Sequence, residues 1–248
     1  MIRLIDVQKT YDNGTRALKG VSMRIEDGEF VFLVGPSGSG KSTLVNLIPR
    51  FYDAASGQVL VDGTDVREYS LDELRDKTGV VPQKSVLFKG TLRDNMRWGK
   101  QDASDEEIYR ALDTAQAREF VDSKGEGLDL YIDQGGHNLS GGQRQRLTIA
   151  RALVRRPEVL IMDDSASALD FATDARLRKA IRENTGDMTV FIVSQRATTI
   201  KSADTILVLD EGRLAGMGTH KELLKDCQVY REICLSQLSK EEVERDEQ

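Results

Sequence analysis

The sequence lacks long hydrophobic runs and has only two cysteines, and each shortage excludes a class of protein. No apolar run approaches the roughly 18 residues that a membrane-spanning helix needs, so we expect that this chain does not itself cross a bilayer. Residues 1–6 carry a charge within their apolar run and no cleavage pattern, so we expect no secretory signal. Cys227 and Cys234 are seven positions apart, which on a helix is about 10 Å and too far for a disulfide. We therefore expect reduced thiols and a cytosolic setting.

An excess of basic charge is also missing. The 248 residues include 35 Lys and Arg against 41 Asp and Glu, which gives a net charge of -6. Bulk binding of nucleic acid usually needs a basic surface, so we expect no nucleic-acid partner. Hydrophobic residues make up 39% and charged residues 31%, a balance that supports a packed core rather than disorder. The length allows one large domain or two lobes.

Short β-type and helical patterns alternate along much of the chain. Residues 2–7 and 21–25 alternate between apolar and polar positions, as half-buried strands do. Phe30–Val34 is continuously apolar, which is typical of a strand buried on both faces, and a helical pattern runs from residue 41 to about 52. Further apolar runs occupy 159–162, 190–193 and 206–209, with helical patterns between the first two. This alternation predicts an α/β fold built on a parallel sheet.

The middle of the chain differs from its two ends. Residues 105–115, 117–122 and 140–154 are helix-like, and no long β-type run lies among them. We therefore predict one domain over 1–248, with an α/β lobe formed by 1–83 and 158–248 and a helical lobe formed by 84–157. Residues 219–238 predict a terminal helix pair. The acidic tail from Lys240 is expected to be a solvated end.

A glycine-rich segment follows the first buried-type strand. Residues 35–42 fit the pattern G-x-x-x-x-G-K-[ST], with a strand before it and a helix after it as the motif requires. Gly38 and Gly40 let the backbone curl so that several N–H groups point at phosphate oxygens. Lys41 can reach the β- and γ-phosphates, and the Ser42 hydroxyl can ligate Mg²⁺. The alternative, a Gly/Ser-rich surface turn, does not account for the order of strand, loop and helix.

Two further motifs bear on the same chemistry. The apolar run 159–162 ends in Asp163 and Asp164, and a carboxylate at such a strand end holds Mg²⁺ beside a phosphate loop, through water for Asp163. Helix-capping aspartates are the simpler alternative. Residues 139–143, with sequence LSGGQ, open a predicted helix whose N-terminus is a second anion-binding surface. Because one nucleotide cannot easily occupy both surfaces of one chain, we infer that this helix end serves a nucleotide held by another chain.

Together with Gln83 in the segment VVPQ, these motifs resemble the nucleotide-binding domain of ATP-binding cassette (ABC) transporters over nearly the whole chain. The resemblance implies a P-loop NTPase fold with a RecA-type parallel sheet core, an N-terminal antiparallel β subdomain and an inserted α-helical subdomain. It also implies ATP and Mg²⁺ as ligands, and a head-to-tail pair of such domains with ATP held between the phosphate loop of one and the signature of the other.

The resemblance assigns roles by position. Tyr11 matches the aromatic residue that stacks on adenine, although a tyrosine at this place could also be part of a β-strand. Gln83 matches the glutamine that senses Mg²⁺ and the attacking water and links to the membrane domain. The implied nucleotide-binding residues are Tyr11, Gly35, Pro36, Ser37, Gly38, Ser39, Gly40, Lys41, Ser42, Thr43 and Gln83. The implied metal-binding residues are Ser42, Gln83 and Asp163, and the implied catalytic residues are Asp163, Asp164 and Gln195. The signature consists of Leu139, Ser140, Gly141, Gly142 and Gln143, and the D-loop residue is Asp170.

Two other segments resemble the exporter subgroup. They are residues 86–95 after Gln83 and residues 218–224 near the C-terminus. In that subgroup a six-helix membrane domain usually precedes this domain in the same polypeptide. We therefore expect either an excised domain or a separate subunit, held at the cytoplasmic face of the plasma membrane by a transmembrane domain outside this chain.

The sequence departs from the family pattern where the water is activated. The family usually has Glu where this chain has Asp164, and His where it has Gln195. The shorter carboxylate is set back by over an ångström, and a misplacement of about 1 Å can cost about 100-fold in rate. Gln195 can donate a hydrogen bond but cannot carry a charge. A glutamate that exporters commonly place near Gln134 is also lacking.

The signature is intact, so the departures fall on one half of the site. This asymmetry resembles the degenerate-site subunit of a heterodimeric ABC exporter, with low activity at its own phosphate loop and a non-identical partner. A fully competent homodimeric transport ATPase remains an alternative. A soluble ABC ATPase without a transport role is less favoured, because we find no coiled-coil insertion, tandem cassette or basic element. His137 and His220 do not match the missing histidine and are expected at a surface or interface.

Overall fold

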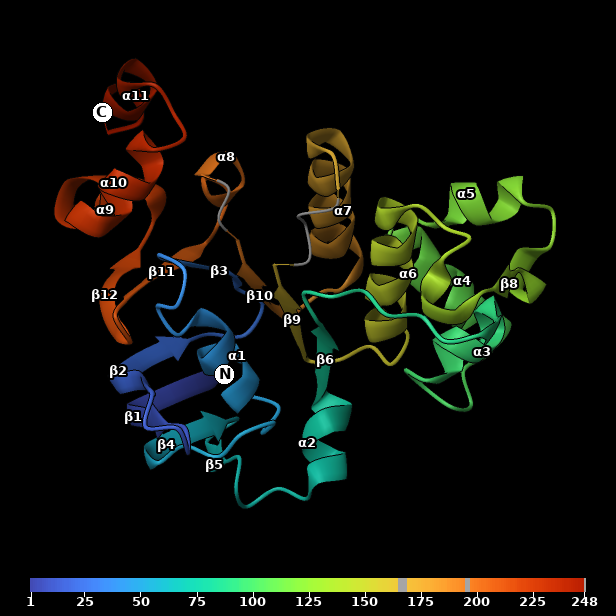
Figure 1. Ribbon diagram of the computed structural model, residues 1–248, viewed down its shortest axis with the longest axis horizontal. Helices are drawn as coiled ribbons and strands as arrows, with labels where there is room; N and C mark the ends of the chain where they lie inside the picture. The colour runs from blue at the N-terminus through green and yellow to red at the C-terminus, as the bar shows by residue number, and fades with distance from the viewer. Residues whose placement is uncertain (165–168, 195–196, 248) are drawn as a thin grey trace. The chain divides into compact units, whose positions relative to one another are not determined.

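The computed structural model describes residues 1–164, 169–194 and 197–247. Its internal contacts divide the chain into two compact units, one formed by Met1–Thr78 with Thr189–Gln248 and the other by Gly79–Met188 (Figure 1). The predicted helical segment 84–157 lies inside the second unit, which also contains the strand that ends in Asp163 and the helix after it.

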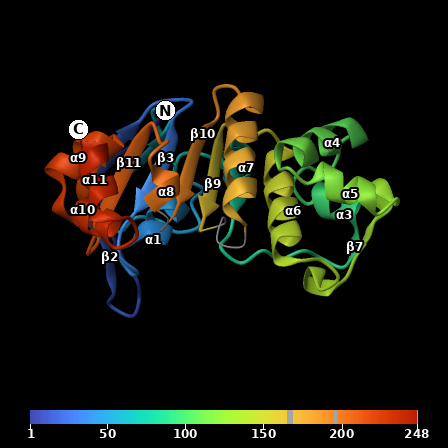
Figure 2. The same cartoon turned by 90° about the horizontal axis from the view of Figure 1, so that it is seen from above.

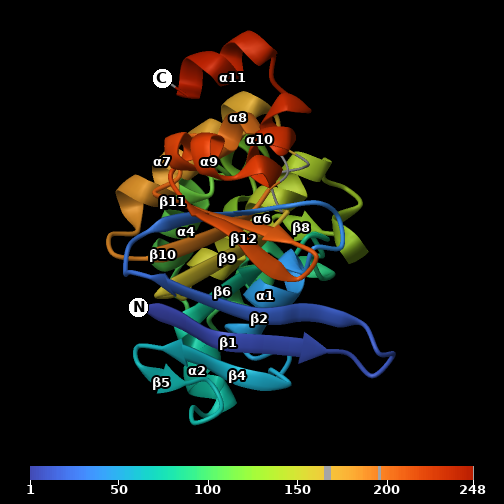
Figure 3. The same cartoon turned by 90° about the vertical axis from the view of Figure 1, so that its left-hand side faces the viewer.

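The first unit begins with an antiparallel sheet (Figure 3). Its strand order is β2-β1-β4-β5, and β1 pairs antiparallel with both β2 and β4. Ile2 and Leu4 are almost fully buried while Arg3 between them is exposed, so the alternation in the sequence corresponds to one buried and one exposed face. This is the antiparallel subdomain that the resemblance implied. The strands are β1 (Ile2–Thr10), β2 (Arg16–Ile25), β4 (Ser56–Val61) and β5 (Thr64–Asp65).

The same unit contains four strands in the order β12-β11-β3-β10. The central strand β3 runs parallel to both β10 and β11, whereas β12 is antiparallel to β11. All residues of β3 and β10 are buried, which explains the continuous apolar runs at 30–34 and 190–193. The prediction of an α/β fold with a parallel core is confirmed. These strands are β3 (Phe30–Val34), β10 (Thr189–Val193), β11 (Thr205–Asp210) and β12 (Arg213–Gly218).

The helix after β3 is shorter than the sequence predicted. Helix α1 (Lys41–Leu47) ends before residue 52. Pro49 has no N–H to continue the helical hydrogen bonds, and Arg50 takes a left-handed φ of 55°. The backbone N–H of Phe51 then donates to Asn46 O at 3.0 Å. Residues 51 and 52 therefore lie in an exposed loop rather than on the helix.

The C-terminal part of the first unit contains the predicted helix pair and a further helix (Figure 1). The acidic tail from Lys240 is largely exposed, as expected, but it forms the helix α11 and is not wholly solvated. Val243 is only 1% exposed, and Asp246 forms an ion pair with Lys201. His220, expected at a surface or interface, is buried and hydrogen-bonds the Tyr230 hydroxyl through Nδ1 at 2.7 Å. The remaining helices of this unit are α2 (Leu71–Lys77), α8 (Ala197–Ile200), α9 (His220–Asp226), α10 (Gln228–Leu235) and α11 (Lys240–Glu247).

The second unit is mainly helical (Figure 2). Its strands β6 and β9 are neighbours in a sheet, and β7 pairs antiparallel with β8. The three predicted helices are confirmed to within a residue or two. Capping boxes at Thr91, Ser104 and Ser140 set the starts of α3, α4 and α6. The elements are β6 (Thr78–Val81), β7 (Gly90–Thr91), α3 (Leu92–Arg97), α4 (Asp105–Thr114), α5 (Arg118–Ser123), β8 (Tyr131–Ile132), α6 (Gly141–Leu153), β9 (Val159–Asp163) and α7 (Phe171–Asn184), with 3₁₀ turns at Gly127–Asp129 and Gln134–Gly136.

None of the described helices is both long enough and apolar enough to cross a membrane.

Candidate nucleotide-binding site

The predicted phosphate loop joins β3 to α1 in the first unit. Gly35 has a φ of 148°, and a Cβ there would lie 2.0 Å from Leu209 O. Gly40 has a φ of 101°, and a Cβ there would lie 2.4 Å from Ala17 O. Any larger residue would collide with backbone at both positions, so the glycines are required by the close approach of β11 and β2.

Lys41 places a positive charge inside this loop. Its side-chain nitrogen donates hydrogen bonds to Gly35 O at 2.8 Å, Pro36 O at 2.7 Å and Ser39 Oγ at 3.3 Å. The residue is only 7% exposed. A compact ammonium group held in this way presents a point charge to phosphate oxygens. Ser42 and the loop residues Ser37 and Gly38 are exposed. The loop therefore has the parts that a triphosphate needs.

Tyr11 lies beside the phosphate loop within the same unit. Its hydroxyl is 3.0 Å from Thr43 Oγ1, so two of the predicted nucleotide-binding residues are in direct contact. The Tyr11 ring also meets the Tyr52 ring edge to face, with centroids 5.6 Å apart. Lys9 Nζ lies 5.3 Å from the centre of the Tyr11 ring. Sequence reasoning missed Tyr52, because residue 52 was expected on a helix, and no motif in the sequence marks Lys9.

The second unit brings Gln83 together with the carboxylate after β9. Gln83 Nε2 donates to Asp164 Oδ2 at 3.3 Å. Asp164 has a left-handed φ of 44°, an uncommon conformation for a residue other than glycine. Asp163 is half-buried at the end of β9. Gln195 lies outside the described residues. The sequence matches the family's D-loop at residues 167–170, and Ser167 and Ala168 of that match also lie outside the described residues.

Metal binding at this unit would depend on few protein ligands. No group of three or more His, Cys, Asp or Glu side chains able to hold a metal occurs in the described ranges of the chain. Mg²⁺ commonly keeps several waters and takes one or two carboxylates together with substrate phosphates. Of the donors predicted from the sequence, Asp163 and Gln83 lie in this unit, and each offers an oxygen, which matches that preference. Ser42, the third predicted donor, belongs to the first unit.

The signature forms the exposed start of α6. Ser140 Oγ accepts from Gln143 N at 3.2 Å, and Ser140 N donates to Gln143 Oε1 at 2.9 Å, so these side chains cap each other's backbone. Arg144 Nη1 donates to Leu139 O at 2.6 Å. Ser140 and Gly141 are exposed, and Gly142 is half-exposed. The N-terminal end of the helix, where the dipole favours anions, is therefore at the surface of the chain.

Asp170 of the predicted D-loop caps the next helix. Its carboxylate accepts from Thr173 N at 2.9 Å and from Thr173 Oγ1 at 2.8 Å. These hydrogen bonds, first that from the backbone, lower the pKa of Asp170. The exposed aspartate thus has a structural role at the start of α7 whatever else it contacts.

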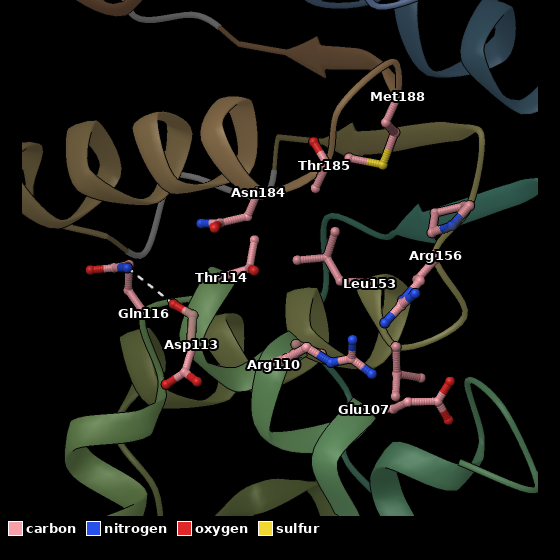
Figure 4. A pocket seen from close by; sticks show the side chains of 13 residues that line it. Glu107, Arg110, Asp113, Thr114, Gln116, Leu153, Arg156, Asn184, Thr185 and Met188 are labelled. Carbon is pink, nitrogen blue, oxygen red and sulfur yellow. Dashed lines mark hydrogen bonds between the residues drawn. The ribbon is translucent and has the colours of Figure 1, made fainter. Parts of the chain in front are cut away.

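The second unit also contains a cavity of about 810 Å³ (Figure 4). It lies among α4, the end of α6 and the end of α7, and its lining includes none of the predicted site residues. Glu107 at its edge is paired with Lys100 at 2.7 Å, and Gln116 Nε2 donates to Asp113 O at 3.1 Å. These lining groups are engaged within the chain, and the cavity adds nothing to the phosphate chemistry.

The phosphate loop, the aspartate pair and the LSGGQ helix define a nucleotide-binding ATPase domain of the cassette class. The family model described as ABC transporter matches residues 18–167, more than half of the chain. The chain belongs to the ABC transporter family.

Curated relatives and a solved structure agree with this assignment. The chain is 45% identical over 241 residues to an uncharacterized ABC transporter ATP-binding protein of Mycobacterium tuberculosis, covering 96% of this chain and 41% of that protein. It is 44% identical over 216 residues to YgaD of Bacillus subtilis, a candidate multidrug export ATP-binding/permease protein, covering 87% of this chain and 37% of that one.

The solved structure is that of a bacterial Atm1-family ABC exporter with ATP bound. The TM-score is 0.92 at 38% identity, with 96% of this chain and 42% of that chain covered. The chain thus spans about two fifths of the length of the relatives it matches. The predicted ABC ATPase fold is confirmed by both comparisons.

Proposed function

We propose that the chain is the ATP-binding subunit of an exporter, which dimerises around MgATP and drives transport through a transmembrane domain outside this chain. One observation carries the proposal. A single chain has a complete phosphate loop around Lys41 and a second anion-binding helix end, exposed at Ser140 and Gly141. Such a helix end can bind a phosphate of a nucleotide held by another chain.

The residues present fit MgATP. The backbone cradle between Gly35 and Gly40 would hold the phosphates, Lys41 would bind the β- and γ-phosphates, and Tyr11 would stack on adenine. Ser42, Gln83 and Asp163 would hold Mg²⁺, which neutralises charge on the transferred phosphoryl group. The loop residues Pro36, Ser37, Gly38, Ser39 and Thr43 complete the nucleotide-binding set.

Hydrolysis at this phosphate loop is proposed to be slow. Asp164 stands where the family has Glu, and its carboxylate accepts from the Gln83 side chain at 3.3 Å. Because Asp is one methylene shorter than Glu, its carboxylate is set back from the water that it would have to orient. Gln195 supplies a neutral side chain where the family has His. The intact signature, Leu139 to Gln143, would act on the ATP of the partner.

The natural partner is proposed to be a second, non-identical nucleotide-binding domain with a Glu and a His at these positions. The relative YgaD is described as an ATP-binding/permease protein, and this supports a transmembrane partner for the present chain. Exposed rings of Phe88 and Trp98, with centroids 4.8 Å apart, lie in or next to the exporter-like segment and offer an apolar contact. The location would be the cytoplasmic face of the plasma membrane. A homodimer that hydrolyses ATP well is the competing assembly.

Nucleotide-dependent association tests the proposal. Light scattering of the 248-residue chain with a non-hydrolysable MgATP analogue should show a dimer. Lys41→Ala and Ser140→Arg should each stay monomeric, because each removes one half of every composite site. Their equimolar mixture should recover dimer, because a mixed head-to-tail pair keeps one intact site. No dimer from the mixture at concentrations that dimerise the wild type would refute the head-to-tail arrangement.

A further inference from the structure

Two side chains beside Tyr11 have no role in the nucleotide site proposed above. Lys9 Nζ lies 5.3 Å from the centre of the Tyr11 ring and 5.6 Å from that of Tyr52. The two rings are 5.6 Å apart and nearly perpendicular, at 86°. This edge-to-face arrangement is a favourable geometry for aromatic pairs. Lys9, Tyr11 and Tyr52 form one cluster within the first unit, here named the base platform.

Tyr11 is held at its backbone and at the tip of its side chain. Its N–H donates to Thr15 O at 2.9 Å, and its carbonyl accepts from Gly14 N at 2.8 Å, so the β1–β2 turn holds the main chain. Its hydroxyl contacts Thr43 Oγ1 at 3.0 Å. These contacts still allow the Tyr11 ring to rotate about its long axis. The ring of Tyr52 and the ammonium of Lys9 restrict this rotation.

The loop that carries Tyr52 is itself tied down. Lys9 Nζ donates to Asp53 O at 2.9 Å, which joins β1 to the loop. The Arg50 side chain pairs with Asp53 Oδ1 at 2.8 Å, and Phe51 N donates to Asn46 O at 3.0 Å. Tyr52 nonetheless remains 43% exposed. Its ring is thus fixed beside Tyr11 without being part of the core.

We propose that Tyr52 and Lys9 are positioning residues that set the plane of the Tyr11 ring for stacking on the nucleobase. The inference rests on the proposed function, because it assumes that Tyr11 stacks on the base. A ring that is already oriented costs less entropy to immobilise when ligand binds. The Lys9 ammonium lies over one side of the ring, so the base stacks on the other side. Tyr52 and Lys9 therefore affect recognition of the base and leave recognition of the phosphates unchanged.

Two ligands separate these effects in the full chain. Isothermal titration measures the Kd of MgATP and of magnesium tripolyphosphate, which has the phosphates without the nucleoside. Tyr52→Ala should raise the Kd of MgATP about two- to tenfold, the range expected from one aromatic pair, and leave that of tripolyphosphate unchanged. Tyr52→Phe keeps the ring edge and should bind MgATP as the wild type does. Lys9→Met should act in the same direction as Tyr52→Ala.

The neighbouring residue gives a matched control. Phe51 is 47% exposed in the same loop, and Arg75 Cζ lies 5.9 Å from the centre of its ring. Phe51→Ala should alter neither Kd. Unchanged MgATP affinity in Tyr52→Ala, or an equal loss for both ligands, would overturn the base platform. A wild-type chain that binds neither ligand would instead overturn the proposed nucleotide site.

Discussion

Asp164→Glu is the substitution that most directly tests why hydrolysis should be slow. It adds one carbon–carbon bond of about 1.5 Å to the side chain. Since a misplacement of about 1 Å can cost about 100-fold in rate, the longer carboxylate can restore at most about that factor, or about 2.7 kcal/mol of barrier. The wild-type carboxylate accepts a hydrogen bond from Gln83 Nε2 at 3.3 Å. The longer side chain must break that hydrogen bond if its carboxylate is to move toward the water.

Backbone conformation limits the gain. Residue 164 has a φ of 44°, which Asp tolerates better than Glu because its short side chain bonds locally. A left-handed conformation costs about 1–2 kcal/mol for an ordinary L-residue. This strain in Asp164→Glu offsets part of the rate that the longer side chain gains. We therefore expect a 10- to 100-fold faster single turnover in Asp164→Glu, with a further increase when Gln195→His is added.

The assay is phosphate release with protein in excess of MgATP, at a protein concentration where light scattering shows the dimer. Asp187→Glu is the control, since it adds the same methylene at an exposed turn of the same unit. An Asp164→Glu chain that binds MgATP and dimerises normally but turns over no faster would show that the short carboxylate is not what limits hydrolysis.

Three other substitutions test separate parts of the structure. Lys41→Ala should weaken MgATP binding about 10- to 100-fold by isothermal titration, because a hydrogen bond to a charged group contributes about 1.5–3 kcal/mol; unchanged affinity would disprove the phosphate-loop assignment. Burial lowers the pKa of His220 from its ordinary 6.5, so the unfolded chain binds the proton more readily and the free energy of unfolding should fall as the pH drops below about 6.5. In urea titrations His220→Gln should lose less stability over that range than the wild type, while His137→Gln, at an exposed position, should follow the wild type. Val243→Ala removes two buried methyl groups and should weaken the docking of α11 by about 1.5 kcal/mol, so its amides should exchange with deuterium roughly tenfold faster.

Elements with a strong local pattern were predictable from the sequence. Strand β3 is continuously apolar and is buried along its whole length, and the alternation from Ile2 onward marks the buried face of β1. Helix α4 has a Ser104 cap with Glu107 three positions on, and its predicted end is one residue from the observed one. In these cases local propensity and tertiary burial favour the same structure.

Elements set by a few distant contacts were not predictable. The acidic composition of α11 indicated a largely exposed end, which is observed, but it did not indicate that the buried Val243 and the Asp246–Lys201 ion pair dock this helix. The helical pattern after Lys41 continues to residue 52, yet Pro49 and the left-handed Arg50 end α1 early. That early end exposes Tyr52 beside Tyr11, so the base platform could not be inferred from periodicity.

The phosphate loop shows the same dependence on distant contacts within a motif that the sequence makes plain. The motif fixes where the glycines are, but the need for Gly35 comes from Leu209 O and the need for Gly40 from Ala17 O, residues far away in the chain. Strands β11 and β2 therefore pack closely against the loop, and Gly212 N, beside β11, donates to Ser39 O at 3.0 Å. A substitution that displaces either strand should weaken nucleotide binding although the motif is unchanged. Under the proposed function, nucleotide binding depends on the phosphate loop, which is complete, while hydrolysis depends on Asp164 and Gln195. The two activities should therefore be separable by mutation.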